Sequence, residues 1–292
     1  MLTVGVAVAH EIKGGEAHLF GVRMEAGQYA RLSVRRRDVD LLVNVSSPGR
    51  RGVTSHENPA GLRSPINLSI LADTSGVYVV EVRPVQEWAA AGLYEIELEG
   101  VRAPGSDDDR RHAAALKVAE GRRQQLLDTR ESLDAAVVSY RDARALWKEL
   151  GDRFEEANAL HFLAETYGRR SALEENKELR TIYSRDAAQA YAEAIELRQA
   201  DGDRQAEAYT RLGWAKLFPL EENGRLPRFE QALALFQEGG NRRGQAAAFY
   251  EMGLAMANMQ DWSSAIQYYQ QALGIYGDTQ DRAAYDRHEE AR

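Results

Sequence analysis

The sequence predicts a protein of two parts, an antiparallel β-sandwich over residues 1–103 followed by an all-α array of helical hairpins over residues 107–292. The first part alternates apolar with polar residues, a period typical of strands that bury one face. In the second part a pattern of small and aromatic residues recurs, and Gly213 and Gly253 are 40 residues apart. A fixed period of this size indicates stacked hairpins rather than a single core.

Seven or eight short strands are expected in the N-terminal part, separated by Gly-, Ser- and Pro-containing turns. Glu95, Glu97 and Glu99 fall on the outer face of the last strand. A sandwich of two such sheets buries the inner faces against each other. The expected inner residues are Leu2/Val4/Val6/Val8, Phe20/Val22/Met24, Ala30/Leu32/Val34, Val39/Leu41/Val43/Val45, Ile66/Leu68/Ile70, Tyr78/Val80/Val82 and Tyr94/Ile96/Leu98.

Four hairpin copies align after the acidic run at residues 107–109, which suits a helix start. Small residues at the crossing points let two helices approach, and an aromatic side chain fills the groove between them, as Tyr269 does beside Gly253. The links between copies are expected to combine a left-handed glycine with an Asp or Asn cap on the next helix. These links read Gly151-Asp152-Arg153, Gly202-Asp203-Arg204 and Gly240-Asn241-Arg242.

Some copies depart from this pattern. The second copy has an insertion of about 11 residues within 169–184, and the tail 280–292 has the pattern of a truncated or capping helix of a fifth copy. Gln124 and Arg225 stand where small residues are usual, so the first copy is expected to be a half-repeat and the third to pack loosely at its turn. Pro227 is expected in the first turn of its helix, where a missing N–H costs nothing.

The alternation of small and aromatic residues resembles the tetratricopeptide repeat (TPR), in a longer-period variant with a Gly-Asp-Arg linker, over residues 128–292. The first part is similar, more weakly, to the bacterial pre-peptidase C-terminal β-sandwich, through the stretches 26–28, 38–41 and 74–78. Proteins that resemble this combination often continue into a caspase-like (CHAT) peptidase domain. Nothing in this sequence matches that domain, whose catalytic cysteine is absent.

The TPR resemblance implies a ligand site on the concave face, lined by the first helix of each hairpin. An extended peptide or a partner helix could lie there with aromatic side chains as anchors. The competing interpretation, favoured for Trp214, Leu217 and Phe218, is that these three side chains are packing residues. The residues carried over are Asn158, His161 and Glu165; Thr210, Trp214, Leu217 and Phe218; and Tyr250, Leu254 and Asn258.

Composition and motifs narrow the function. A net charge of -8 argues against a general nucleic-acid binder, and no apolar run is long enough to span a membrane. The chain has no cysteine, its six histidines lack metal-site spacing, and it has no phosphate loop, nucleophile elbow or dinucleotide fingerprint. We therefore expect a non-enzymatic protein without metal or cofactor.

Two smaller clusters of charged residues fall in the predicted sandwich. Arg35, Arg36 and Arg37, with Arg50 and Arg51, form a basic cluster that suits either an acidic partner or a solvated sheet edge. Asp38 and Asp40 could contribute to a calcium site, but no further oxygen ligands are nearby in the sequence.

The function expected is a scaffold that binds a protein or peptide on the concave helical face. The alternative is the regulatory N-terminal portion of a longer CHAT-type peptidase. Self-association through the exposed C-terminal repeat is a third expectation. The sandwich resemblance favours the bacterial periplasm or exterior if a leader has been removed, and the cytoplasm otherwise.

Overall fold

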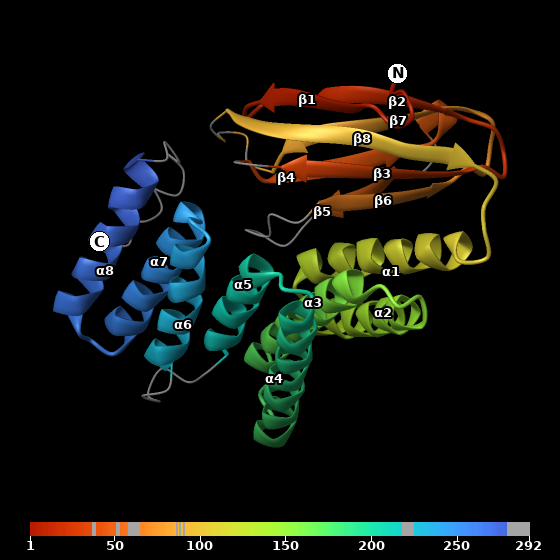
Figure 1. Ribbon diagram of the computed structural model, residues 1–292. Helices are drawn as coiled ribbons and strands as arrows, with labels where there is room; N and C mark the ends of the chain where they lie inside the picture. The colour runs from red at the N-terminus through yellow and green to blue at the C-terminus, as the bar shows by residue number, and fades with distance from the viewer. Residues whose placement is uncertain are drawn as a thin grey trace. The chain divides into compact units, whose positions relative to one another are not determined.

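The computed structural model describes residues 1–36, 39–50, 53–57, 65–85, 87, 89, 91–217 and 225–278 (Figure 1). These residues form an N-terminal antiparallel β region followed by eight helices. The fold class expected from the sequence is therefore confirmed. Two compact units are present, one comprising residues 1–120 with 145–151, the other residues 121–144 with the chain from residue 152 onward.

The β region consists of two four-stranded antiparallel sheets, in the orders β1-β8-β3-β6 and β2-β7-β4-β5. Chain neighbours β1 and β2 belong to different sheets, so the connections cross repeatedly between the layers. The strands are β1 (Ala7–Ile12), β2 (His18–Met24), β3 (Tyr29–Arg36), β4 (Leu41–Ser46), β5 (Val53–Glu57), β6 (Ile66–Leu71), β7 (Gly76–Pro84) and β8 (Gly92–Arg102), and a 3-10 turn, η1 (Pro48–Arg50), follows β4.

One apolar core joins the two sheets, and it contains the inner faces predicted for all strands after the first. The first strand differs from the prediction, because Val4 and Val6 are 51% and 48% exposed and β1 begins only at Ala7. Gly5 explains the difference, since its φ of 74° is left-handed and interrupts the extended chain. Val4 makes only an isolated parallel bridge to Leu98.

The outer face of the β3–β8 pair accounts for part of the predicted basic cluster. Arg35 contacts Glu95 and Glu97 across the two strands, at 2.9 and 3.4 Å, so its charge is met within the sheet. Arg36 is buried and forms an ion pair with Asp40. The Asp40 carboxylate, a candidate calcium ligand, is therefore neutralised by an arginine. Arg37, Asp38 and Arg51, and the side chain of Arg50, lie outside the described part of the chain.

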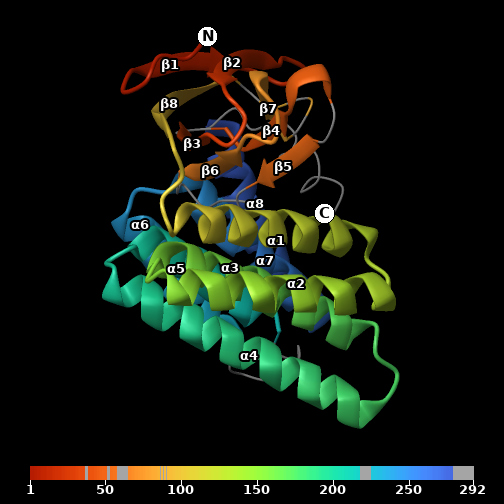
Figure 2. The ribbon, with the colours of Figure 1, turned by 90° about the vertical axis from the view of Figure 1, so that its right-hand side faces the viewer.

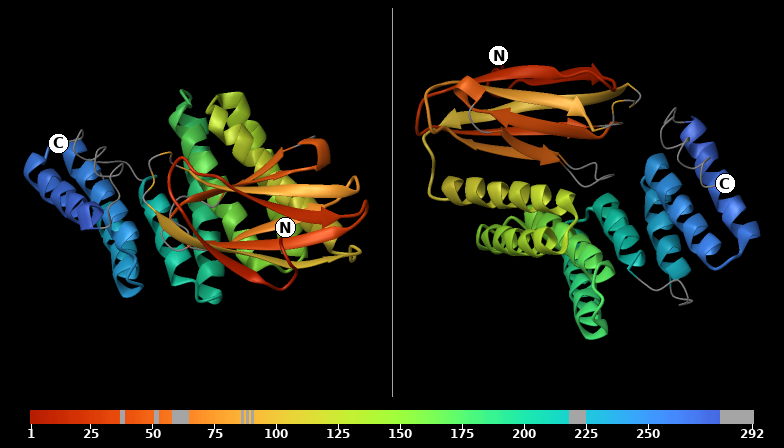
Figure 3. Two further views of the ribbon diagram at one scale, coloured as in Figure 1. Left: turned by 90° about the horizontal axis from the view of Figure 1, so that it is seen from above. Right: turned by 180° about the vertical axis from the view of Figure 1, so that it is seen from behind.

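Helices α3 to α8 pack as neighbours along the chain, with α3 against α4, α5 against α6 and α7 against α8. Contacts also join α4 to α5 and α6 to α7, and Figure 3 shows α6, α7 and α8 side by side. The helices are α1 (Asp108–Leu127), α2 (Arg130–Glu149), α3 (Arg153–Ala172), α4 (Lys177–Ala200), α5 (Arg204–Ala215), α6 (Arg225–Glu238), α7 (Arg242–Asn258) and α8 (Trp262–Asp278).

Small residues do lie where helices cross. A Cβ on Gly253 would be 2.5 Å from the Tyr269 ring, and one on Gly213 would be 2.8 Å from the Tyr191 hydroxyl. Ala232 and Ala272 are fully buried.

In the first copy the predicted register was wrong. Gly121, rather than Gln124, occupies the small-residue position, because its Cβ would be 2.7 Å from the Tyr140 ring. This copy therefore has the same glycine–tyrosine contact as the α7–α8 pair, three residues earlier than the sequence alignment placed it.

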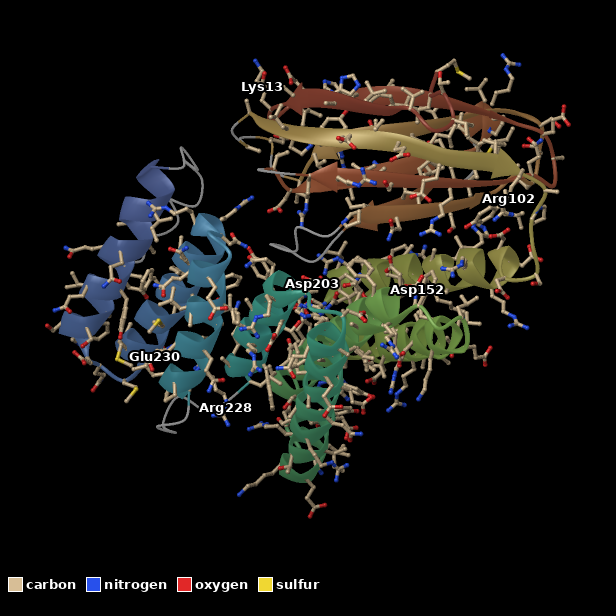
Figure 4. The ribbon with its side chains drawn as sticks, viewed as in Figure 1. Lys13, Arg102, Asp152, Asp203, Arg228 and Glu230 are labelled. Atoms are coloured by element: carbon tan, nitrogen blue, oxygen red, sulfur yellow. The ribbon has the colours of Figure 1, made fainter. Side chains whose placement is uncertain are left out.

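The links between hairpins form as predicted. Gly151, Gly202 and Gly240 have φ values of 67°, 71° and 62°, and the next residue caps a helix in each case. Asp152 and Asp203, labelled in Figure 4 at the starts of α3 and α5, accept hydrogen bonds from backbone N–H groups three residues later. These caps satisfy helix donors that have no intrahelical partner.

The insertion in the second copy lengthens a hairpin instead of forming a loop. Helix α4 has 24 residues, whereas α6 and α8 have 14 and 17 (Figure 2). Arg170, near the end of α3, contacts Asp134 of α2 at 2.9 Å and Glu174 at 2.8 Å. These contacts of the buried Arg170 side chain fix the end of the lengthened hairpin.

Helix α6 begins with Arg225, the residue found where a small side chain was expected. Arg225 is the first residue of α6, donates a hydrogen bond to the Lys216 carbonyl at 3.3 Å, and lies over the Phe229 ring. Pro227 falls in the first turn of the helix, as predicted.

Candidate functional site

The first helices of successive hairpins hold the residues predicted to bind a ligand, and α3 contacts α5 as α5 contacts α7. Asn158, His161 and Thr210 are buried. Five others are half-buried, and Asn258 is exposed at the end of α7. Phe218 lies outside the described residues. The half-buried side chains are Glu165, Trp214, Leu217, Tyr250 and Leu254.

The buried members form a polar network between α3 and α5 around Arg198, a residue of α4 that is only 3% exposed. Its guanidinium donates to Asn158 Oδ1 at 3.2 Å, and also to Thr210 Oγ1 and the Ala206 carbonyl. The hydroxyl of Thr210 donates to the same carbonyl at 2.9 Å and lies 3.3 Å from His161 Nδ1. The network therefore connects three helices through their interior.

Arg198 replaces an aromatic residue. It stands four residues after Ala194, and the matching residues of the other copies are Trp147, Phe236 and Tyr276. Among the described residues no carboxylate lies within ion-pair distance of it, and burial lowers its pKa to about 10. Because an arginine at an apolar position is costly without hydrogen-bond partners, the polar residues on α3 and α5 are explained as its acceptors.

His161 and Glu165 connect this interior to the more exposed edge of α3. Burial lowers the pKa of His161 below 6.5 although the Glu165 carboxylate beside it raises that pKa, and the cations of Arg198 and Lys216 add to the lowering. Burial alone would raise the pKa of Glu165, but the His161 ring 3.7 Å away and the charges of Arg122 and Lys216 lower it to about 2. At neutral pH the histidine is thus neutral and the glutamate ionised.

Charged residues continue along the first helices. Lys216, at the end of α5, forms an ion pair with Glu251 of α7 at 2.5 Å. Arg122 lies one residue after Gly121, as Glu165 lies one after Ala164, and its guanidinium stacks over the Phe162 ring. The sequence alignment missed Arg122 because the first copy was placed three residues out of register.

The apolar members take part in packing as well. The Leu217 side chain fills the space beside Gly168, where a Cβ would be 2.6 Å from Leu217 Cδ2. Tyr250 and Leu254 pack against the cluster of Met256, Ala265 and Tyr269. Each remains half-buried, so a face of each side chain is open to solvent.

The residues missed from the sequence are Arg198, Arg122, Lys216 and Glu251. For Arg198 a signal existed, namely an arginine where the other copies have aromatic residues. Lys216 and Glu251 gave no signal, because their pairing depends on how two hairpins stack.

The sandwich brings two of the scattered histidines together. The rings of His10 and His18 lie 5.4 Å apart, and His18 Nδ1 is 2.8 Å from the Tyr94 hydroxyl. Two imidazoles alone give too few ligands for a zinc site. Throughout the described ranges, no three His, Asp or Glu side chains are grouped closely enough to hold a metal ion.

The fold thus defines an antiparallel β-sandwich followed by an all-α array compatible with a helical repeat protein. None of the described helices is long and apolar enough to cross a membrane. Comparison with known proteins finds no matching family model and no matching curated protein.

Among solved structures, the chain is similar to BtubC (BKLC) from P. vanneervenii, with 17% sequence identity over 64% of this chain and 91% of that chain. The TM-score is 0.30, and this likeness assigns no function to the chain.

Proposed function

We propose that the helical array is of the TPR type and binds a protein or peptide on the surface formed by Glu165, Trp214, Leu217, Tyr250 and Leu254, here called the inner surface. The chain would act as a non-enzymatic scaffold. The observation that supports this proposal is that aromatic and aliphatic side chains remain half-exposed on consecutive first helices. Trp214 and Leu254 occupy matching positions, one residue after Gly213 and Gly253.

The composition of the inner surface suits recognition of a peptide. Aromatic side chains supply contact area at low entropic cost and dominate binding energies in many interfaces. Charged groups of both signs, Glu165 and the Lys216–Glu251 pair, lie beside them and can fix the register of a bound chain.

The buried network beneath the inner surface supports it. Arg198 joins α3, α4 and α5, so Glu165 on α3 and Trp214 on α5 extend from helices whose spacing is fixed from within. Preorganised sites bind more tightly because less freedom is lost on association.

A phage-displayed random peptide library tests the proposal. We expect peptides selected on the full chain to bind saturably, and to lose binding to a Trp214→Ala/Tyr250→Ala variant. Leu179→Ala is the control, since Leu179 lies on α4, outside the inner surface, and is 43% exposed. Circular dichroism shows whether each variant keeps its helices.

The proposal fails if no library peptide binds saturably, or if the double variant retains its helices and binds as the unaltered chain does. A Tyr250→Phe variant, which keeps the ring, should bind almost normally because the contact area is retained.

A further inference from the structure

Helix α8 differs from the other helices in charge. It has no charged residue before Asp278, its last, whereas every other helix contains several. Large apolar side chains nevertheless face solvent on it, with Trp262 61% and Ile266 42% exposed. Loss of charge with gain of aromatic residues is the compositional mark of an interface core.

The exposed residues of α8 form a continuous face, here called the α8 stripe. Residues four apart follow one ridge of a helix surface, and such ridges interlock when two helices pack. The uncharged part of the ridge extends to Gly274, four residues before Asp278, and a Cβ on Gly274 would meet no atom within 4 Å. The stripe consists of Trp262, Ile266, Gln270 and Gly274, flanked by Ser263, Gln267 and Gln271.

In the preceding hairpin, the residue that corresponds to Ile266 is covered by the hairpin that follows it. Leu226 of α6 precedes Ile266 by the 40-residue period, and it packs against Met256, Ala265 and Tyr269 of the next hairpin. In this array an apolar residue at that position is therefore a contact residue. On α8 it is exposed.

We propose that the α8 stripe is a dimer interface, occupied by the α8 stripe of a second copy in antiparallel orientation. Two copies that each have a net charge of -8 repel each other over most of their surface. The stripe is free of charge, so it can meet itself without placing like charges in contact.

Shape favours the same pairing. A twofold axis near Tyr268 places Ile266 of one copy opposite Gln270 of the other. It also brings each Trp262 indole toward Gly274 of the second copy, where the missing side chain leaves room for a large ring. The α8 stripe thus contains both a large side chain, Trp262, and a position without a side chain, Gly274, and the twofold axis brings one against the other.

Sedimentation velocity of the full chain over a concentration series tests the dimer. We expect a monomer–dimer equilibrium that Trp262→Ala weakens by about thirtyfold or more, as for a central aromatic anchor. Leu179→Ala is the control, because Leu179 is comparably exposed on α4 and lies outside the stripe. Circular dichroism verifies that the helices persist.

The antiparallel register has its own test. Ile266→Lys alone and Gln270→Glu alone should each be monomeric, since each buries an unpaired charge in the dimer. An equimolar mixture of the two should recover association, because the register places the lysine of one copy opposite the glutamate of the other.

A chain that remains monomeric at the highest concentration overturns the proposal. A dimer that Trp262→Ala leaves unchanged also overturns it. Failure of the mixture to recover overturns the register. None of these variants alters the inner surface, so the outcome is separate from that of peptide binding.

Discussion

Replacing Arg198 by alanine should destabilise the helical unit by about 3 kcal/mol. The change removes a buried group that donates to three oxygens, on Asn158, Thr210 and Ala206. Thr210 and the Ala206 carbonyl keep their mutual hydrogen bond, but Asn158 Oδ1 loses its Arg198 donor. This oxygen would then be buried without the hydrogen bond that offsets its removal from water, which destabilises the folded state.

The magnitude comes from two opposing effects. Hydrogen bonds from a charged donor contribute about 2 kcal/mol each, so three of them contribute about 6 kcal/mol. Burial of the cation opposes this, because lowering its pKa from 12.5 to about 10 corresponds to about 3 kcal/mol against the charged form. The difference, about 3 kcal/mol, favours the intact network.

Urea unfolding followed by circular dichroism, with hydrogen exchange of the α4 and α5 amides, measures the loss. Arg153→Ala is the matched control, because Arg153 is exposed and its ion pair with Asp201 is 3.8 Å long; such pairs contribute little. A loss below about 1 kcal/mol for Arg198→Ala would refute the reasoning.

A compensating variant sharpens the test. Replacing Arg198 by Phe together with Asn158→Leu and Thr210→Val restores the aromatic residue of the other copies and removes the orphaned acceptors. Buried polar groups replaced together by apolar ones often leave stability unchanged or improved. The triple variant should therefore be more stable than Arg198→Ala, and the opposite order would contradict the proposed role of the network.

Further predictions concern packing, capping and pH. Gly253→Ala should cost about 1–3 kcal/mol because its Cβ would overlap the Tyr269 ring, whereas Gly274→Ala, with open space around it, should stabilise the monomer by about 0.5–1 kcal/mol; thermal unfolding distinguishes them. Asp203→Ala should cost about 1 kcal/mol through loss of the α5 cap, visible as faster amide exchange at the start of that helix. Burial lowers the pKa of His161, so the unfolded chain takes up the proton more readily. The contribution of His161 to the free energy of unfolding should therefore be fully present above pH 6.5 and fall as the pH drops below it. His161→Asn should remove this contribution to the pH dependence, as measured by urea titrations at several pH values.

Local rules made much of the fold predictable. Glycine followed by Asp or Asn marked each link correctly, because a left-handed residue and a side-chain cap are requirements of the local backbone. Likewise, alternation identified the buried faces of six strands, since it reflects a constraint within each strand.

The errors arose where the outcome depends on contacts distant in sequence. Gln124 was misplaced because the first hairpin has three more residues between its glycine and tyrosine than the α7–α8 hairpin has. The sequence placed Arg35 in a basic cluster. In the structure, Arg35 forms ion pairs with Glu95 and Glu97 on the neighbouring strand, which are about 60 residues away in the chain. At the turns within hairpins, Asp128 and Gln260 adopt left-handed φ values of 52° and 61°, which composition did not suggest.

The candidate site was predictable only as a set of positions. The TPR resemblance indicated which helix faces to inspect, but three of its residues, Asn158, His161 and Thr210, lie in the interior. Their burial follows from Arg198, which lies on a different helix. Ligand binding at the inner surface, and the alternative role in a longer peptidase, stay predictions.

The lengthened second hairpin has a practical consequence. Its extra residues extend α3 and α4 to a tip held by Arg170, Glu174 and the Asn176 cap, and the repeat contacts of α4 remain in place. The turn at residues 173–176 lies at the end of the part by which the second hairpin exceeds the α5–α6 and α7–α8 hairpins in length. It is therefore the natural position for an epitope tag or a fluorophore that should report on binding without disturbing the surfaces proposed to mediate it.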